Sequence, residues 1–314
     1  DLHLSLRRER QMCIRDSHTG AISDNESDFH SKAGIIDGTP VLRGAAPVDN
    51  KLKEQIESSD LSVVIAGFKE FEDKEFIQTA YTEWGASGLA AVWAESNTRE
   101  AIYNAFRRKE TFATTGSRIK VRFFAGYEID NALSAEDPVS FAYSRGVTMG
   151  SDILESDGKA PSFLVWALRD IKRAPLDRVQ IIKGWTEISG RTYEKVFDVA
   201  CSWGVAPDPT TNRCPNNGAK VNLDNCEISK NVGSNELKTI WKDPEFDPSI
   251  KAFYYVRVLE NPTCRWSTWD ALKSGNKPRA DVTPTIQERA WSSPIWYVPN
   301  NRGFAAVNIL PDDL

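Results

Sequence analysis

The spacing of hydrophobic and polar positions changes part-way along this 314-residue chain. In the later part, apolar and polar side chains alternate in short segments. In AFYYVRVLE, for example, Tyr254 and Val256 share one face and Arg257 lies on the other. A period of two is typical of half-buried antiparallel strands. Similar segments occur at residues 118–124, 162–170, 177–185, 195–202 and 292–299. The pattern predicts an antiparallel β-sandwich-like domain over residues 118–314.

Residues 18–117 predict an α/β region instead. The apolar runs LSVVIAGF (61–68) and GLAAVWA (88–94) indicate buried strands. Helices are expected within VDNKLKEQIESS and NTREAIYNAFRRKE, and Asn97 is the predicted cap of the second helix. The apolar stripe of that helix consists of Ala101, Ile102, Ala105 and Phe106. A stripe of this kind faces a core, so the helix is expected to be mostly structural.

Composition narrows the class of protein and of partner. The chain is 40% hydrophobic and 26% charged, with a formal net charge of −5. This is ordinary globular composition, and no run approaches the ~18 apolar residues of a membrane helix. The opening DLHLSLRRERQ is too charged for a signal peptide. Because the sequence has no basic stripe, nucleic acid is not expected as a partner. A small-molecule substrate is expected instead.

Four of the five cysteines lie in the second region, and Cys13 stands apart. An even number without a CxxC pair favours two disulfides over a zinc site, and hence a periplasmic or secreted protein. Three pairings are possible. The preferred one joins Cys201 to Cys214 across a hairpin and Cys226 to Cys264. The alternative is a cytosolic protein with reduced, buried cysteines.

The segment RDSHTGAISDNESDFHSK holds two of the three histidines. Asp16 and His18 are two residues apart, so on an extended segment both side chains point to one side and can bind a divalent metal. His30 either edges that site or is a solvated loop residue. Thr114 and Thr115 offer hydroxyls that could hold an oxyanion, although a simple turn into the next strand explains them equally well.

The segment EWGASGLAAVWAESNTREAIYNAFRRKETFATTGSRIKVRFFAGYEI resembles the closing segment of metal-dependent hydrolases of the PHP (polymerase and histidinol phosphatase) superfamily. Over residues 18–314, the chain resembles a bacterial family known as the domain of unknown function numbered thirty-six-oh-four. The shared motifs are DSHTG, RRKETFATTGSRI, YSRGVTMGSDI, DRVQIIKGW, AFYYVRVLENPTCRWSTWDA and SSPIWY. The resemblance implies that residues 18–117 are the C-terminal part of a distorted β/α barrel.

The resemblance also implies a ligand set. It assigns metal ligands to Asp16 and His18. His3 in DLHL is either a relic of one histidine of the opening HxH motif, at the edge of the site, or a chance match. The run LSLRRERQMCIRDS resembles translated read-through of a sequencing-library adapter, so residues 1–17 are interpreted as an artefact. Asp16 lies where this run meets the rest of the chain, and the family pattern has Asp at the same position. The remaining ligands of the superfamily have no counterpart, and we expect the chain as given to be inactive.

Two functions from different classes therefore stand. The first is a metal-dependent hydrolase in which Zn, Mn or Fe activates water against a phosphoester, ester or amide. In this function, Trp84 or Trp93 either walls the cleft or packs in the core. The alternative is a non-catalytic secreted module that binds carbohydrate or protein. Its contact surface would contain the aromatic side chains Trp203, Trp266 and Trp269.

Overall fold

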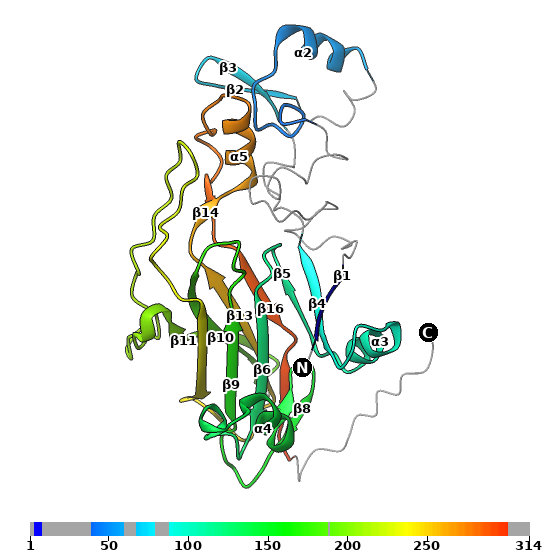
Figure 1. Ribbon diagram of the computed structural model, residues 1–314, viewed down its shortest axis with the longest axis vertical. Coiled ribbons are helices and arrows are strands. Elements are labelled where there is room, and N and C mark those ends of the chain that lie inside the picture. The colour runs from blue at the N-terminus through cyan, green and yellow to red at the C-terminus, as the bar shows by residue number, and fades with distance from the viewer. Residues whose placement is uncertain (1–2, 8–38, 60–66, 79–87, 188, 301–314) are drawn as a thin grey trace.

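The computed structural model describes residues 3–7, 39–59, 67–78, 88–187 and 189–300, and for residues 3–7 it describes the backbone alone. Figure 1 shows two β-sheets side by side, with most of the helices at the edges or at one end. Several predicted residues lie outside the described ranges. They are Asp16, His18, His30, Trp84 and most of the predicted strand 61–68.

The larger sheet is nine-stranded in the described part of the chain. Its order is β1 (His3–Arg7), β4 (Leu89–Ala94), β5 (Thr111–Thr114), β16 (Arg289–Ser292), β13 (Ala252–Glu260), β10 (Leu176–Thr186) and β11 (Thr192–Cys201). In addition, β17 (Ile295–Val298) pairs with β13 and lies parallel to β8 (Asp152–Leu154). The other ladders of this sheet are antiparallel.

The smaller sheet has the order β12 (Glu236–Lys242), β9 (Ser162–Leu168), β6 (Lys120–Gly126) and β7 (Val147–Thr148), and its ladders are also antiparallel. The main core lies between the two sheets. Phe163 of β9 packs against Tyr254 of β13 with ring centroids 4.5 Å apart. Val165 and Val256 belong to the same buried cluster. Two sheets with a shared apolar interior are the arrangement that the alternating segments predict.

Helices and short two-stranded ladders flank this pair of sheets, and two of the helices pack on sheet faces. They are α2 (Asn50–Glu57), α3 (Arg99–Arg107), α4 (Pro138–Arg145), α5 (Trp266–Lys273), β2 (Phe68–Phe71) with β3 (Lys74–Ile77), β14 (Thr263–Cys264) with β15 (Thr285–Ile286), and the short 3₁₀ turns Ala132–Ser134 and Ser202–Gly204. At the end that carries α5, Arg43 donates to Asp270 at 2.8 Å, and both side chains are buried. Within the described ranges, none of the helices is long and apolar enough to span a bilayer.

The strand predictions in the second half are confirmed, since all six alternating segments contain strands. The helix of residues 99–107 is confirmed too, and its Ala105 packs against Val92 and Ala94 of β4. Its predicted cap is wrong. The hydroxyl of Thr98, not the Asn97 side chain, accepts from the backbone N–H of Ala101.

The expected barrel is wrong for the residues that the structure describes, because they form a β-rich fold without a closed barrel. The run GLAAVWA predicts a buried strand because almost every position is apolar, and the family resemblance assigns this strand to a barrel. The strand β4 is indeed buried on both faces. However, α3 covers one face, Trp93 and Ala91 join the inter-sheet core on the other, and both sheet neighbours are antiparallel. An apolar run records burial, and it does not record strand direction.

The predicted domain boundary at residue 118 falls between β5 and β6. On its N-terminal side, β4 and β5 belong to the larger sheet, and β5 pairs directly with β16. On its C-terminal side, β6 belongs to the smaller sheet. The sheet thus runs across the boundary, and the division into two units stays a prediction.

A candidate polar pocket beside two β-bulges

Two β-bulges lie close together at one end of β10. In the ladder with β13, Leu176 faces Glu260 and Arg178 faces Leu259, so Asp177 is an extra residue on β10. In the ladder with β11, Val179 faces Ala200 and Gln180 faces Asp198, so Val199 is the extra residue. Bulges change the direction of nearby side chains and are frequent next to binding sites. Here they bring the carboxylates of Asp177 and Asp198 to the same region.

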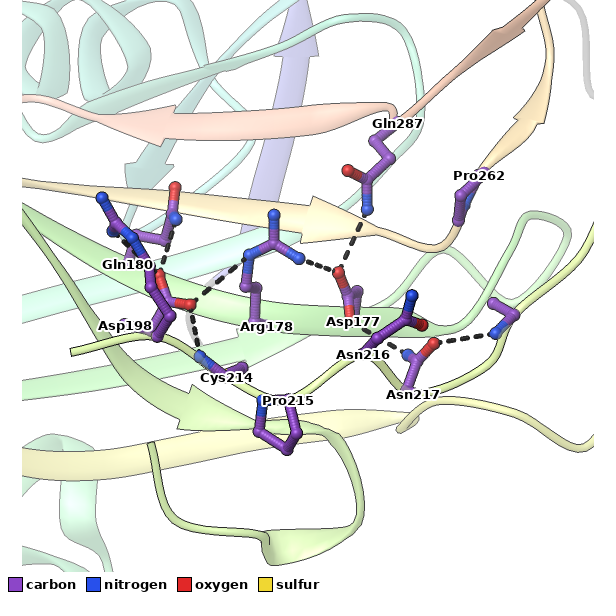
Figure 2. A pocket seen from close by; sticks show the side chains of 12 residues that line it. Asp177, Arg178, Gln180, Asp198, Cys214, Pro215, Asn216, Asn217, Pro262 and Gln287 are labelled. Carbon is purple, nitrogen blue, oxygen red and sulfur yellow. Dashed lines mark hydrogen bonds and ion pairs between the residues drawn. The ribbon is translucent and has the colours of Figure 1, made fainter. Parts of the chain in front are cut away.

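A pocket of about 470 Å³ opens at this place. This volume is within the ~300–1,000 Å³ range of small-molecule sites. Figure 2 shows that its side chains come from the bulged strands, from the loop at 213–219 and from segments near β13 and β16. The lining consists of Asp177, Arg178, Gln180, Asp198, Arg213, Cys214, Pro215, Asn216, Asn217, Ala219, Pro262 and Gln287.

Asp198 is the anchor of one side of the pocket. Its side chain is only 2% exposed. It accepts from Gln180 Nε2 at 2.6 Å and from the backbone N–H of Cys214 at 2.7 Å. Ion pairs with Arg178 at 3.7 Å and Arg213 at 3.5 Å supply positive charge. A buried carboxylate with this many partners is held in one position, which preorganises the wall around it.

Asp177 is held differently, at the bulge itself. It forms an ion pair with its neighbour Arg178. Its two oxygens also accept from Asn217 at 2.9 Å and Gln287 at 3.1 Å. Burial raises the pKa of the Asp177 carboxyl above its ordinary value, although the charge of Arg178 and the hydrogen bond from Gln287 act against the rise. The pocket therefore holds a carboxyl group whose protonation is sensitive to its surroundings.

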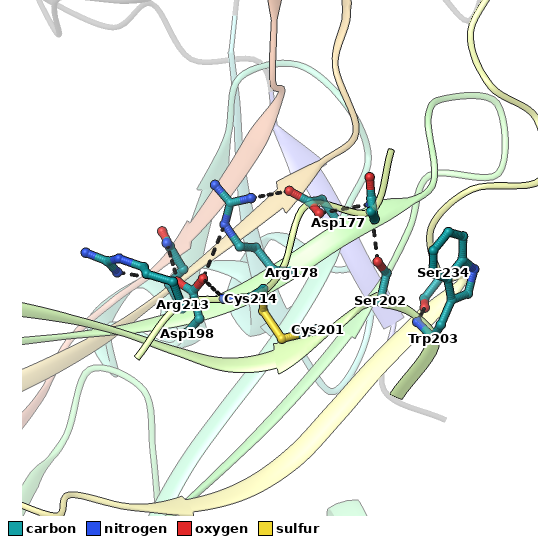
Figure 3. The surroundings of a disulfide bond; sticks show 11 residues. Asp177, Arg178, Asp198, Cys201, Ser202, Trp203, Arg213, Cys214 and Ser234 are labelled. Atoms are coloured by element: carbon teal, nitrogen blue, oxygen red, sulfur yellow. Dashed lines mark hydrogen bonds and ion pairs between the residues drawn. A yellow bond between two sulfur atoms is a disulfide. The ribbon is translucent and has the colours of Figure 1, made fainter. Parts of the chain in front are cut away.

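The first disulfide fixes the loop that closes the pocket. Cys201, at the end of β11, is bonded to Cys214 in the loop, as Figure 3 shows. Farther along this loop, the Asn217 amide is within hydrogen-bond distance of Ser202 Oγ at 3.2 Å and Asn261 Oδ1 at 2.7 Å, in addition to Asp177. The second disulfide joins Cys226 to Cys264. Both predicted pairings are confirmed.

Close packing continues behind the Asn217 amide, at Gly233. This glycine has φ +99°, and a Cβ placed there would lie 2.7 Å from Asn261 Nδ2 and 2.8 Å from the Leu176 carbonyl oxygen. The Asn261 amide in turn donates to the carbonyl of Val232 at 2.7 Å. A side chain at position 233 would displace Asn261, and with it the partner of Asn217.

The other described candidates have structural contacts. Thr114 is buried, and its hydroxyl accepts from Gly116 N. The Thr115 hydroxyl accepts from the backbone N–H of Arg289 at 2.9 Å. Trp93 donates to the Val121 carbonyl at 2.7 Å from within the core. These contacts match the turn and core-packing alternatives of the sequence analysis.

The aromatic candidates differ in exposure. Trp203 is 56% exposed, beside the first disulfide (Figure 3), and Trp266 is buried in α5. Trp269 is half-buried. Of the three aromatic residues proposed as a contact surface, only Trp203 is thus largely available.

The metal prediction lies elsewhere in the chain. Asp16, His18 and His30 are outside the described residues, and only the backbone of His3 is described. Within the ranges that are described, no group of three or more His, Cys, Asp and Glu side chains could hold a metal ion. The predicted ligands therefore stay a prediction.

Sequence reasoning missed the pocket because bulges have no reliable sequence pattern. Asp198 could have been noticed, since it interrupts the apolar segment VFDVAC. Asp177 and Arg178 precede VQII and look like ordinary residues of a strand end. Only the ladder registers show that both carboxylates lie at the same pocket.

Comparison with known families places the chain. The family model described as "Protein of unknown function (DUF3604)" matches residues 12–299. The chain belongs to this family. No curated protein and no solved structure gives a significant match. The DUF3604 match includes every residue of the pocket, and also Asp16 and His18, so both candidate sites belong to the family's region of similarity.

Proposed function

We propose that the β-rich part of the chain binds a small, polar, saccharide-like ligand in the pocket beside the bulges. The observation that carries this proposal is the paired placement of Asp177 and Asp198 at two separate bulges. Carboxylate, amide and guanidinium groups line one cavity and are held by each other rather than by bulk water. A ligand rich in hydroxyls can exchange hydrogen bonds with such groups.

A disulfide-fixed wall supports the same proposal. Because Cys214 is tied to β11, the loop pays little conformational entropy when a ligand binds. Two disulfides also fit an oxidising compartment, and we include export to the periplasm or the exterior in the proposal. This function corresponds to the binding-module alternative.

The test fills the pocket without touching its polar network. In Ala219→Phe, a ring enters the cavity from a lining position. Ala280→Phe, at an exposed site in another loop, is the matched control. Neutral and acidic monosaccharides are titrated by calorimetry or by NMR. Binding to the parent and to the control, with loss in Ala219→Phe, supports the proposal. If no sugar binds, or if the filled variant binds as well as the parent, the proposal is wrong.

A second function, metal-dependent hydrolysis, is favoured by the Asp-x-His pattern of DSHTG and by the resemblance to the PHP superfamily. Asp16 and His18 would bind Zn, Mn or Fe, and a bound metal of this kind lowers the pKa of water and stabilises a developing oxyanion. On an extended segment, a carboxylate and an imidazole two residues apart would point to the same side. The two functions are compatible, because the pocket and this motif lie in different parts of the sequence.

The metal proposal is tested by metal content. The protein is loaded with Zn or Mn, desalted and analysed for bound metal in the parent, His18→Ala and His30→Ala. We expect His18→Ala to lose metal, because an imidazole ligand is removed, and His30→Ala to retain it. Hydrolysis of a phosphoester and an ester is measured on the same samples, and we expect none, because the remaining ligands of the superfamily have no counterpart in this sequence. Equal metal content in the parent and His18→Ala would contradict the assignment.

A further inference from the structure

Three arginines lie on one face of the larger sheet, beside the pocket. In the ladder of β13, Leu259 faces Arg178 of β10 on one side and Arg289 of β16 on the other. Arg257 lies two residues from Leu259 on β13 and therefore points to the same face. Neighbouring strands are about 4.8 Å apart, so the three long side chains surround Leu259 at short range. This group of Arg178, Arg257 and Arg289 is called the arginine triad below.

The face that carries the triad points away from the inter-sheet core. The residues that alternate with the triad, Val179, Val258 and Ala290, belong to the buried cluster between the sheets. The triad side chains are themselves half-buried, and that of Arg178 is 27% exposed. The triad side chains are thus partly accessible to solvent, and Arg178 also lines the pocket.

Each guanidinium is oriented by one or two contacts and retains further donors. Arg257 Nε donates to Gln180 Oε1 at 2.6 Å, and Arg289 Nε donates to the Gln287 carbonyl at 3.0 Å. Both acceptors belong to residues that line the pocket. Among the residues that the structure describes, the terminal nitrogens of Arg257 and Arg289 have no hydrogen-bond partner. They form a fixed set of N–H donors at the pocket's edge.

The local charge is unusual for an acidic chain. Arg178, Arg213, Arg257 and Arg289 carry four positive charges near three carboxylates, those of Asp177, Asp198 and Glu194. The pKa of Arg257 is lowered, first by burial and then by repulsion from Arg289 and Arg178, while Tyr255 and Glu194 act in the opposite direction. Three mutually repelling cations on one face are stabilised by an anion placed between them.

We propose that the arginine triad binds an oxoanion, a carboxylate or a sulfate, carried by the polar ligand of the neighbouring pocket. The ligand class is then an acidic sugar: its hydroxyls lie against the amides and carboxylates of the pocket, and its oxoanion takes the paired N–H donors of the guanidinium groups. Planar guanidinium forks suit both oxoanions. This inference rests on the proposed saccharide site and specifies its ligand.

The probes are sodium glucuronate, glucose and sodium sulfate, titrated into the full chain at constant ionic strength. Glucose has the same ring as glucuronate and lacks the carboxylate. The proposal expects glucuronate to bind at least about tenfold more tightly than glucose, the factor that one charge-assisted hydrogen bond contributes. It also expects sulfate to compete with glucuronate.

The variants are Arg289→Gln and its conservative partner Arg289→Lys, with Arg145→Gln as the control. Arg145 is an exposed arginine on α4 that pairs only with Glu128 among described residues. Arg289→Gln should abolish the preference for glucuronate over glucose, Arg289→Lys should keep part of it, and Arg145→Gln should keep all of it. Near-ultraviolet circular dichroism checks that each variant is folded.

The outcomes separate the two proposals. Equal binding of glucose and glucuronate that is insensitive to Arg289→Gln overturns the oxoanion site and leaves the saccharide pocket standing. Absence of binding by any sugar at millimolar concentration overturns both. Loss of discrimination in Arg145→Gln as well would show a general charge effect and would also overturn the triad.

Discussion

At the scale of single residues, Glu260 is a fully buried acidic side chain at the end of a central strand. It ends β13, its side chain is fully buried, and its two carboxylate oxygens have no hydrogen-bond partner among the described residues. Burial raises the pKa of this carboxyl well above its ordinary value of 4.5, and the negative charges of Glu288 and Asp170 raise it further. At pH values between the unfolded and the folded pKa, the folded protein therefore retains a proton that the unfolded chain releases.

The Glu260→Gln variant tests this proton. Since the pKa is higher in the folded state, its contribution to stability is complete below pH 4.5 and is lost as the pH rises toward the folded pKa. The amide does not titrate. As the pH increases from 4 to 8, the free energy of unfolding should therefore fall more in the parent than in Glu260→Gln. Urea unfolding at several pH values measures this difference. Parallel pH profiles for the two proteins would contradict the raised pKa.

Lys183 is a buried cation that, unlike Glu260, has a close partner of opposite charge. Its ammonium lies 2.5 Å from Asp243 Oδ2 and donates to the Glu245 carbonyl at 2.7 Å. Tyr254 also donates to Asp243, at 2.8 Å. Lys183→Met leaves the Asp243 carboxylate buried without its cation, and we expect a loss of about 3–5 kcal/mol in the free energy of unfolding.

The matched control for Lys183 is Lys195 on the neighbouring strand. Lys195 pairs with Glu245 at the surface, where the side chains are 35% and 52% exposed. Exposed pairs contribute about 0–1 kcal/mol, so Lys195→Met should be nearly neutral. Denaturant unfolding of both variants measures the contrast. Similar losses in the two variants would show that the buried pair contributes no more than the exposed one.

At the scale of elements, the start of α3 separates two neighbouring capping candidates. The Thr98 hydroxyl accepts from Ala101 N at 3.2 Å. Thr98→Ala should therefore reduce stability by about 1 kcal/mol, because a backbone N–H of the first turn loses its acceptor. Asn97→Ala is the comparison and should have little effect. Thermal unfolding measures both variants. A larger loss of stability in Asn97→Ala than in Thr98→Ala would show that Asn97 is the cap after all.

This helix also illustrates what could be predicted and what could not. Element type followed from periodicity in α3 and in the strands of the second half, because burial on one face determines which positions are apolar. The choice between Asn97 and Thr98 depends on where the first helical turn begins, and a one-residue uncertainty is enough to reverse it. For β4, the unbroken run of apolar residues correctly indicated burial on both faces. Its antiparallel neighbours were not predictable, since they depend on contacts with β5 and β1.

The candidate site was harder to predict than the elements, for a related reason. Asp177, Asp198 and the arginine triad come from four strands and meet only because of ladder register. Cysteine pairing was easier. Cys201 and Cys214 are near in sequence, and even cysteine counts leave few combinations.

At the scale of the whole molecule, the two disulfides tie loop residues to strands, Cys214 to the end of β11 and Cys226 to β14. Cys201–Cys214 closes a short loop, and Cys226–Cys264 spans 38 residues to reach β14. Protein made in an oxidising compartment and unfolded without reductant should have one titratable thiol, that of Cys13, and five after reduction. Reduction should lower the melting temperature. Each cross-link lowers the conformational entropy of the unfolded chain and so stabilises the folded state by about 3 kcal/mol. Five thiols before reduction would contradict both bonds.

The bulge at Asp177 has a consequence for how such a pocket can arise. Without this one residue, Leu176 would be followed directly by Arg178 and Val179, and the strand would alternate regularly between core and surface. Every other side chain of β10 would keep its face. The fold can therefore do without the residue that the pocket requires. We therefore expect that a single-codon insertion into a regular strand can add a carboxylate beside the arginine triad, and that a single-codon deletion can remove it, with the alternation of core and surface positions preserved.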